Sequence, residues 1–246
     1  MKNLKNLSLS SGITLGIMIV AMLGYKTIPE GNTLHRLMQV IGGDIVGGGY
    51  IQALTYFAFF LALFETRRRI RGVHRERRAF GMNVIPTNEK NVFLPNDINN
   101  LKFKLVELAK KDRFILIDLL KKTCTKFRSA DNLGELIDIV SMQVEIYQDK
   151  AESDQSVIRY LVWVIPSLGF IGTVIGISMA LAIANSGDME AITTALAVAF
   201  DTTLVALVLS VIIMWYLHEL QEKYDKLHSD LKEFVIENFI NKIELN

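Results

Sequence analysis

The chain has 246 residues, of which 50% are hydrophobic, and its mean hydropathy is +0.29. This composition is typical of a membrane protein that carries a substantial water-exposed part. Twenty-seven basic and 26 acidic residues give a formal net charge of +1, so the charge balance does not favour nucleic-acid binding. The single cysteine, Cys124, excludes an intramolecular disulfide.

Motifs for enzyme chemistry are missing from the sequence. It contains no Gly-rich phosphate loop, no nucleophile elbow and no His pair at metal-ligand spacing. We therefore expect a protein that is not an enzyme and that has no resident cofactor and no metal.

The N-terminal part, residues 1–64, is predicted to form a membrane hairpin. Residues 7–25 are apolar and follow Lys2 and Lys5, so they form either a first span or a cleaved signal peptide. No small-x-small cleavage site follows, which favours a retained span. Leu34, Leu37, Met38 and Ile41 then recur at helical spacing and predict a short interfacial helix outside the cytoplasm. The second span is predicted at residues 45–64.

Seven arginines lie between residues 67 and 78, directly after the second span. Such a run on its own suggests an RNA-binding arm, but beside a span it is the positive-inside signal for a cytoplasmic end, with attraction to anionic lipids as a secondary effect. Four spans in this orientation place both termini in the cytoplasm.

A cytoplasmic helical region is predicted at residues 65–159. Residues 79–96 contain Gly and Pro and are expected to be largely irregular. Three helices are predicted to begin with Asp97, Asp112 and Asp131 as N-caps. The third is expected to continue without a break into the membrane, which makes the cytoplasmic part a helical stalk.

Two further spans, at about 160–185 and 191–217, are joined by a short polar link and must form an antiparallel hairpin. The second continues as a C-terminal cytoplasmic helix within residues 218–246. The predicted fold is therefore all-α, with four transmembrane helices and a helical cytoplasmic extension.

Polar and small residues inside this hairpin are the candidate functional residues. Gly169, Gly172 and Gly176 recur at helical spacing and allow close approach of another helix. Asp201 is the only ionisable residue deep inside a span, where a carboxylate costs at least ~2.5 kcal/mol and normally faces a partner or a water-filled path. The other interpretation of Asp201 is a packing role, through hydrogen bonds to threonines of a neighbouring helix.

Two motifs in the hairpin resemble the MotA/TolQ/ExbB superfamily of proton- or sodium-driven channel subunits. Pro166, followed by LGFIGTVIG at residues 168–176, is similar to the proline and LGxxGTxxG pattern at the start of the penultimate span. The stretch ALAVAFDTTLVALVLS at residues 195–210 is similar to the AxAxxxTTLxG pattern of the last span. Together the motifs indicate the superfamily but not a branch.

This resemblance implies a multi-pass protein of the bacterial inner membrane that conducts H⁺ or Na⁺. It implies five copies around two copies of a single-span partner similar to MotB, TolR or ExbD, with ion flow converted into rotation or mechanical work. Thr173 and Thr202 or Thr203 would line the ion path. Asp201 departs from the family pattern and is added to that path as a hypothesis; Pro166 and the three glycines are assigned to helix packing.

Three alternatives remain. The protein could be a non-conducting membrane scaffold of the same fold, it could specifically be a flagellar stator subunit, or it could be a membrane-bound enzyme or receptor. Counting residues from the ends of their spans places Thr173 and Asp201 near the middle of the bilayer. If Asp201 lines the ion path, Asp201→Asn should abolish or retune conduction, whereas a structural Asp201 predicts that Asn is tolerated.

Overall fold

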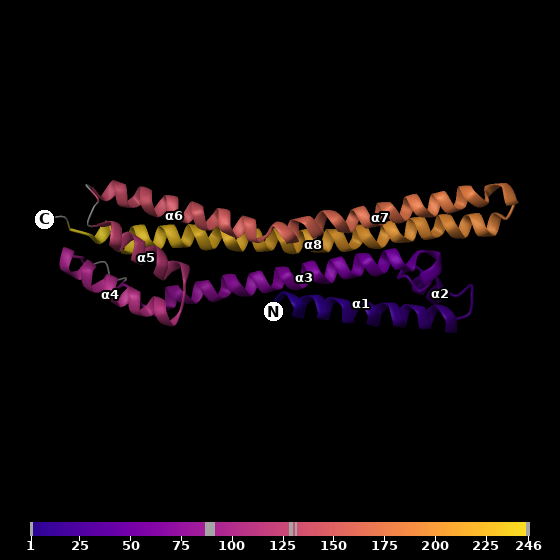
Figure 1. The fold of residues 1–246 in the computed structure, drawn as a ribbon, viewed down its shortest axis with the longest axis horizontal. Helices are drawn as coiled ribbons and strands as arrows, with labels where there is room; N and C mark the ends of the chain where they lie inside the picture. The colour runs from indigo at the N-terminus through magenta and orange to yellow at the C-terminus, as the bar shows by residue number, and fades with distance from the viewer. Residues whose placement is uncertain (1, 87–91, 128–129, 131, 245–246) are drawn as a thin grey trace. The chain divides into compact units, whose positions relative to one another are not determined.

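The computed structural model describes residues 2–86, 92–127, 130 and 132–244, and helices account for most of them (Figure 1). The α-helices are α1 (Lys2–Thr27), α2 (Thr33–Val40), α3 (Tyr50–Arg77), α4 (Pro95–Lys111), α5 (Ile115–Lys126), α6 (Leu133–Asp154), α7 (Ser156–Ile183) and α8 (Met189–Asn238). Short helical turns occupy Ile45–Gly49, Arg78–Met82, Ala184–Ser186 and Ile240–Lys242. No strand runs through these described ranges, where extended pairing is limited to one bridge between Phe93 and Ile243. The all-α prediction is confirmed.

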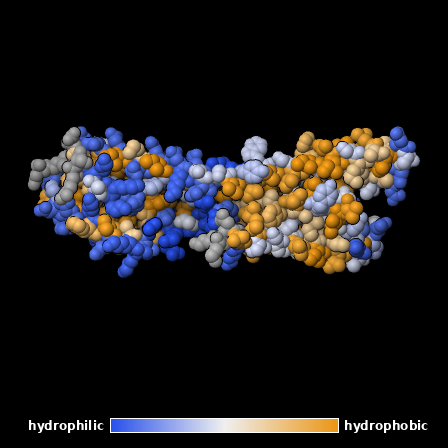
Figure 2. All heavy atoms as spheres, viewed as in Figure 1, coloured by the Kyte–Doolittle hydropathy of each residue, from blue (hydrophilic) through white to orange (hydrophobic). Residues whose placement is uncertain are grey.

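Four helical stretches among the described residues are long and apolar enough to cross a membrane: Leu4–Thr27, Ile45–Met82, Leu133–Ser186 and Met189–Lys242. Their apolar parts include the four predicted spans, which confirms the prediction of a polytopic membrane protein. The chain divides into a membrane unit (Met1–Arg68 and Ser156–Glu219) and a polar unit (Arg69–Gln155 and Leu220–Asn246). Hydrophobic residues cover most of the visible surface of the membrane unit, and hydrophilic ones gather on the polar unit (Figure 2).

The helix expected to run unbroken from residue 131 into the membrane is interrupted at one residue, Gln155. α6 ends at Asp154 and α7 begins at Ser156. The Gln155 backbone N–H and its side-chain amide both donate to the Ala151 carbonyl, at 3.2 and 3.0 Å. The turn therefore stays hydrogen-bonded, and the division between the two units falls at this position.

Close approach of α7 and α8 in the membrane unit depends on the glycine stripe. Gly169, Gly172 and Gly176 are all buried, and a Cβ at Gly176 would lie 2.7 Å from the Ala199 Cβ. A Cβ at Gly172 would collide with the Thr202 side chain. The stripe is thus covered by α8 of the same chain, so it supplies no surface for packing against another copy.

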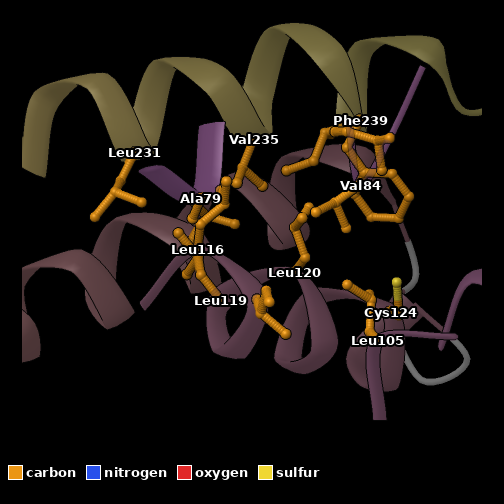
Figure 3. Packing of buried hydrophobic residues seen from close by; sticks show 14 of the residues in the cluster. Ala79, Val84, Leu105, Leu116, Leu119, Leu120, Cys124, Leu231, Val235 and Phe239 are labelled. Carbon is orange, nitrogen blue, oxygen red and sulfur yellow. The ribbon is translucent and has the colours of Figure 1, made fainter. Parts of the chain in front are cut away.

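The polar unit has its own hydrophobic core, so it is more than a stalk. α5 lies at its centre, with Leu116, Leu119 and Leu120 at most 1% exposed. Figure 3 shows these side chains against Leu231 and Val235 of α8 and Phe239 just after it, with Leu105 of α4 and Cys124 nearby. Burial raises the pKa of the Cys124 thiol to about 12, so this cysteine is a packing residue.

The ends of the helices in the polar unit differ from the predicted caps. α4 begins two residues before Asp97, because Pro95 fits the first turn, and Asp97 accepts a bond from the Leu94 N–H at 3.1 Å. α5 is capped from α3, where the Glu76 carboxylate accepts from the Ile115 N–H at 2.8 Å. Asp112, the predicted cap, instead ends α4. The predicted start at Asp131 lies outside the described residues, and Asn132 caps α6.

Three arginines of the run form ion pairs within the polar unit. Arg69 pairs with Asp154 at 3.1 Å, Arg75 with Asp112 at 3.6 Å, and Arg77 with Asp230 at 2.8 Å. These partners belong to α6, to the end of α4 and to α8. The run therefore ties α3 to three other elements, in addition to any orienting effect on membrane insertion.

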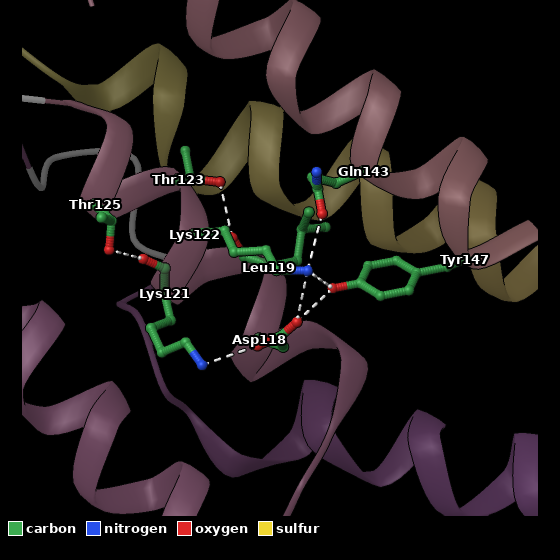
Figure 4. Close-up of polar contacts among 8 residues, drawn as sticks. All are labelled: Asp118, Leu119, Lys121, Lys122, Thr123, Thr125, Gln143 and Tyr147. Atoms are coloured by element: carbon green, nitrogen blue, oxygen red, sulfur yellow. Dashed lines mark hydrogen bonds and ion pairs between the residues drawn. The ribbon is translucent and has the colours of Figure 1, made fainter. Parts of the chain in front are cut away.

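A second charged network joins α5 to α6 (Figure 4). Asp118 pairs with Lys121 and Lys122, each at 2.9 Å, and accepts from the Tyr147 hydroxyl at 2.7 Å. Although partial burial opposes it, these three donors lower the pKa of the Asp118 carboxyl to about 2. The network is satisfied within the unit and fixes α6 against α5.

His228 provides a test of the packing of the polar unit, because it is 1% exposed and neither ring nitrogen has a hydrogen-bond partner. Burial lowers its pKa, an effect that Asp225 partly offsets. The unfolded chain therefore takes up a proton at higher pH than the folded chain does. Stability is fully present above the ordinary pKa of about 6.5 and falls as the pH drops below it, by at most ~1.4 kcal/mol per pH unit.

We expect the midpoint of thermal unfolding in detergent to fall between pH 7.5 and pH 5 with a steeper slope in the wild type than in His228→Phe, which keeps a ring against Tyr224. His74→Gln, at an exposed position of the same unit, should retain the wild-type slope. An unchanged slope in His228→Phe would contradict the burial argument.

A second test concerns the glycine stripe. Gly172→Ala should destabilise the membrane unit by about 1–3 kcal/mol, because the added methyl group meets Thr202 in a closely packed interface. Gly16→Ala is the matched control, since nothing lies within 4 Å of its added Cβ, and alanine is preferred over glycine in a helix by roughly 1 kcal/mol. Thermal unfolding of the two variants should thus shift in opposite directions; equal shifts would count against the tight contact.

Candidate functional site

Two threonine hydroxyls meet at the contact between α7 and α8. The Oγ1 atoms of Thr173 and Thr203 contact each other directly. Backbone carbonyl oxygens lie next to both: Gly169 O is 2.9 Å from Thr203 Oγ1, and Ala199 O is 3.1 Å from Thr173 Oγ1. The structure thus gathers four oxygen atoms from two helices, with one hydroxyl proton on each threonine.

The hydroxyl pair lies at the surface of the membrane unit. Both threonine side chains are half-buried, and exposed apolar residues flank them along each helix. On α7 these are Phe170, Val174 and Ile177, and on α8 they are Phe200, Leu204 and Leu207. An oxygen cluster in the middle of an apolar face lowers the cost of bringing a cation or a water molecule to that face.

Thr202 occupies a different environment from its neighbour. It is 1% exposed, its hydroxyl donates to Ala199 O at 2.9 Å, and it packs against Gly172. Of the two alternatives that the motif left open, Thr203 lies beside Thr173 at the surface, whereas Thr202 lies in the helix contact. The place of Thr202 on the ion path stays a prediction.

Pro166 lies inside α7, which continues through it from Ser156 to Ile183. A proline has no N–H for the helix ladder, yet spanning helices tolerate it where neighbouring groups satisfy the freed carbonyl. Pro166 precedes Gly169, the first glycine of the stripe, by about one turn.

Asp201 is bound by an arginine that the sequence analysis did not select. Arg36 of α2 donates from both terminal nitrogens to the two carboxylate oxygens of Asp201, and both distances are 2.7 Å. The Asp201 side chain is 6% exposed and the Arg36 side chain is 47% exposed. This bidentate geometry is the strongest form of a charge-assisted hydrogen bond between side chains.

α2 is held in place by contacts with α1 and α3, which fix the position of Arg36. Gln52 donates to Val40 O at 2.7 Å and Tyr56 to Ile41 O at 3.0 Å, so two carbonyls at the end of α2 are satisfied by α3. On the other side, the His35 ring lies 4.6 Å from the Tyr25 ring of α1, measured between centroids.

The turn between α2 and α3 also contacts α8. Gly48 has φ 142°, a conformation that favours glycine, and it packs directly against Val198. At the other end of α3, the Arg67 guanidinium lies 6.0 Å from the centre of the Tyr216 ring. Nineteen residues separate Gly48 from Arg67 and eighteen separate Val198 from Tyr216, so α3 and α8 run parallel and nearly in register.

This register changes the expected depth of Asp201. If the second span begins near residue 45, Asp201 lies about 9 Å inside that level and Thr203 about 12 Å inside it. The middle of a 30 Å hydrocarbon core is about 15 Å from either face. This depth is smaller than the one obtained by counting along the span that contains Asp201, because the α7–α8 hairpin projects beyond the start of α3 (Figure 1).

Arg36 could have been selected from the sequence by looking for opposite charges on different membrane segments. A single arginine lies on a short amphipathic helix between two spans, and a single aspartate lies inside another span. What the sequence lacks is the register between α3 and α8 that brings α2 level with Asp201.

Comparison with known proteins identifies a family for this chain. Residues 111–233 match the MotA/TolQ/ExbB proton channel family. No curated protein and no solved structure matches the chain. The matched segment contains α7, the turn after it and the hydroxyl pair, and it extends to both sides into the helices of the polar unit. Since the match covers half of the 246 residues, the chain belongs to the MotA/TolQ/ExbB proton channel family.

Proposed function

We propose that the protein is an ion-conducting subunit of the inner membrane and that the hydroxyls of Thr173 and Thr203 line its ion path. The single observation that carries this proposal is the oxygen cluster of these two residues on an exposed apolar face. Hydroxyl and carbonyl oxygens can replace part of the hydration shell of a cation or of a water molecule that carries a proton. Family membership supports the same chemistry.

The rotation of α8 supports the choice of Thr203. Successive residues of a helix are about 100° apart, so Thr203 is turned by roughly 200° from Asp201. Asp201 and Val198 face α2 and the turn at Gly48. Thr203 therefore points away from the N-terminal hairpin, toward α7 and the exposed apolar residues on both sides of the hydroxyl pair.

A partner is proposed to cover this open face. The exposed apolar residues beside Thr173 and Thr203 suit a second helix in the membrane, since helices there associate by packing. We propose five copies of the chain around two copies of a MotB-, TolR- or ExbD-like single-span protein. In this arrangement, ion passage would be converted into rotation or mechanical work. The arginine run would place both termini in the cytoplasm, with α2 on the opposite side.

The first test measures ion flux. The complex would be extracted from the native membrane and reconstituted in liposomes, with H⁺ and Na⁺ entry followed separately by fluorescent dyes. Thr173→Val and Thr203→Val should each lower the flux per complex by roughly tenfold or more, because valine keeps the shape but removes the oxygen. Thr193→Val is the matched control, since its hydroxyl bonds only to carbonyls of its own helix turn.

Intact complexes with wild-type flux in both variants would reject the hydroxyl path. A wild-type complex that carries neither ion would instead favour a non-conducting scaffold of the same fold.

The second test concerns assembly. The mass of the detergent-extracted complex, measured by native mass spectrometry, should correspond to five copies of the 27.7 kDa chain plus two copies of one smaller protein. A monomer or a dimer would remove the proposed ring while leaving the assignment to the family unchanged.

A further inference from the structure

The pair of Arg36 and Asp201 is not explained by the proposed ion path. Asp201 faces α2, on the side of α8 away from Thr203, and both of its oxygens are already bound by one guanidinium. The charge of this carboxylate is already balanced by Arg36, and one lone pair on each of its oxygens is used by the guanidinium. We therefore look for a role of the pair other than ion binding.

We propose that Arg36 is a positioning residue, whose pair with Asp201 fixes the rotation of α8 and thereby holds Thr203 beside Thr173. This proposal rests on the proposed function for its link to ion flux. The pair itself is established by contacts between α2 and α8 that do not depend on that function.

The rotation of α8 is set from two directions. On one side, Ala199, Thr202 and Ala206 pack against the glycines of α7. These are van der Waals contacts, which set the distance between the two helices more than their relative orientation. On another side, the Arg36 fork binds Asp201 with two parallel hydrogen bonds, which fixes both distance and orientation.

Contacts with α1 and α3 hold α2 in place, so Arg36 binds Asp201 from a fixed position. Its last carbonyls are bound by Gln52 and Tyr56, and Met38 fills the space beside Gly24 of α1. Arg36 also donates to the Gln39 side chain of α2 at 3.0 Å, and this bond helps to orient the guanidinium toward Asp201. A movement of α8 relative to the N-terminal hairpin would thus have to break charged hydrogen bonds.

The unequal exposure of the two partners predicts unequal effects of mutation. Removing Arg36 leaves a carboxylate that is 6% exposed without its counter-charge, which is costly in apolar surroundings. Removing the charge of Asp201 leaves a guanidinium that is 47% exposed and can reach water. Arg36→Gln should therefore be more damaging than Asp201→Asn, and the double variant should recover part of the loss.

An ion-carrying Asp201 predicts the opposite order. If the carboxylate itself binds the ion, Asp201→Asn should abolish flux whichever residue occupies position 36. Arg36→Gln would then free the carboxylate and leave flux unchanged or raised.

The experiment is a double-mutant cycle on the complex extracted from the native membrane. Arg36→Gln, Asp201→Asn and the double variant would be compared for H⁺ and Na⁺ flux per complex and for thermal unfolding in detergent. Lys26→Gln and Glu190→Gln are controls that remove one charge each at exposed positions of the membrane unit. We expect flux in Arg36→Gln to fall by roughly tenfold or more, with flux in the double variant several-fold higher than in Arg36→Gln.

Loss of flux in Asp201→Asn and in the double variant, with wild-type flux in Arg36→Gln, would overturn the proposal and assign Asp201 to the ion path. Wild-type flux in all three variants would also overturn it. If the wild-type complex conducts neither ion, the proposed function fails, but thermal unfolding still reports whether the two residues are coupled. Additive shifts in that measurement would show that the pair does not position α8.

Discussion

Close contact between α7 and α8 is the constraint on which the membrane unit depends. The backbones approach so closely that a Cβ at Gly169, Gly172 or Gly176 would collide with α8. Only at this separation can a hydroxyl on one helix reach a carbonyl on the other, as Thr203 reaches Gly169 O at 2.9 Å. The glycines therefore act through the geometry of the polar groups beside them, because a wider separation would leave those oxygens to their own helices.

Polar groups in an apolar environment need partners, and this requirement organises the rest of the unit. Asp201 takes Arg36, Gln52 and Tyr56 take the end carbonyls of α2, and Thr202 takes a carbonyl of its own helix. Each pairing removes a desolvation penalty, and those of Asp201, Gln52 and Tyr56 also fix α2 against α8 or α3. α2 is positioned in this way, although it has only eight residues and none of them is buried.

Much of the fold could be predicted from the sequence, since apolar length and helical periodicity are local signals. The four spans, the short helix after the first span and the continuation of α8 beyond the membrane all follow from them. Caps were harder, because α5 receives its cap from Glu76, 39 residues earlier. The hydroxyl site was found through its motif, but Arg36 was missed. Its role depends on the register between α3 and α8, which Gly48 and Val198 set across 150 residues of chain.

The commitment of Asp201 to Arg36 has a consequence for how an ion could be carried. Hydroxyls and carbonyls are neutral, so Thr173 and Thr203 can lower the cost of passing a charge but cannot neutralise it. Asp201 is the only carboxylate deep inside a span, and its two oxygens are bound by a guanidinium on the other side of α8. On the proposed ion path, a neutralising carboxylate for the open face would then come from a partner chain. In the proposed function the two features divide the work, because the pair at Asp201 holds α8 in place while the neutral oxygens of Thr173 and Thr203 line the face that a partner would cover.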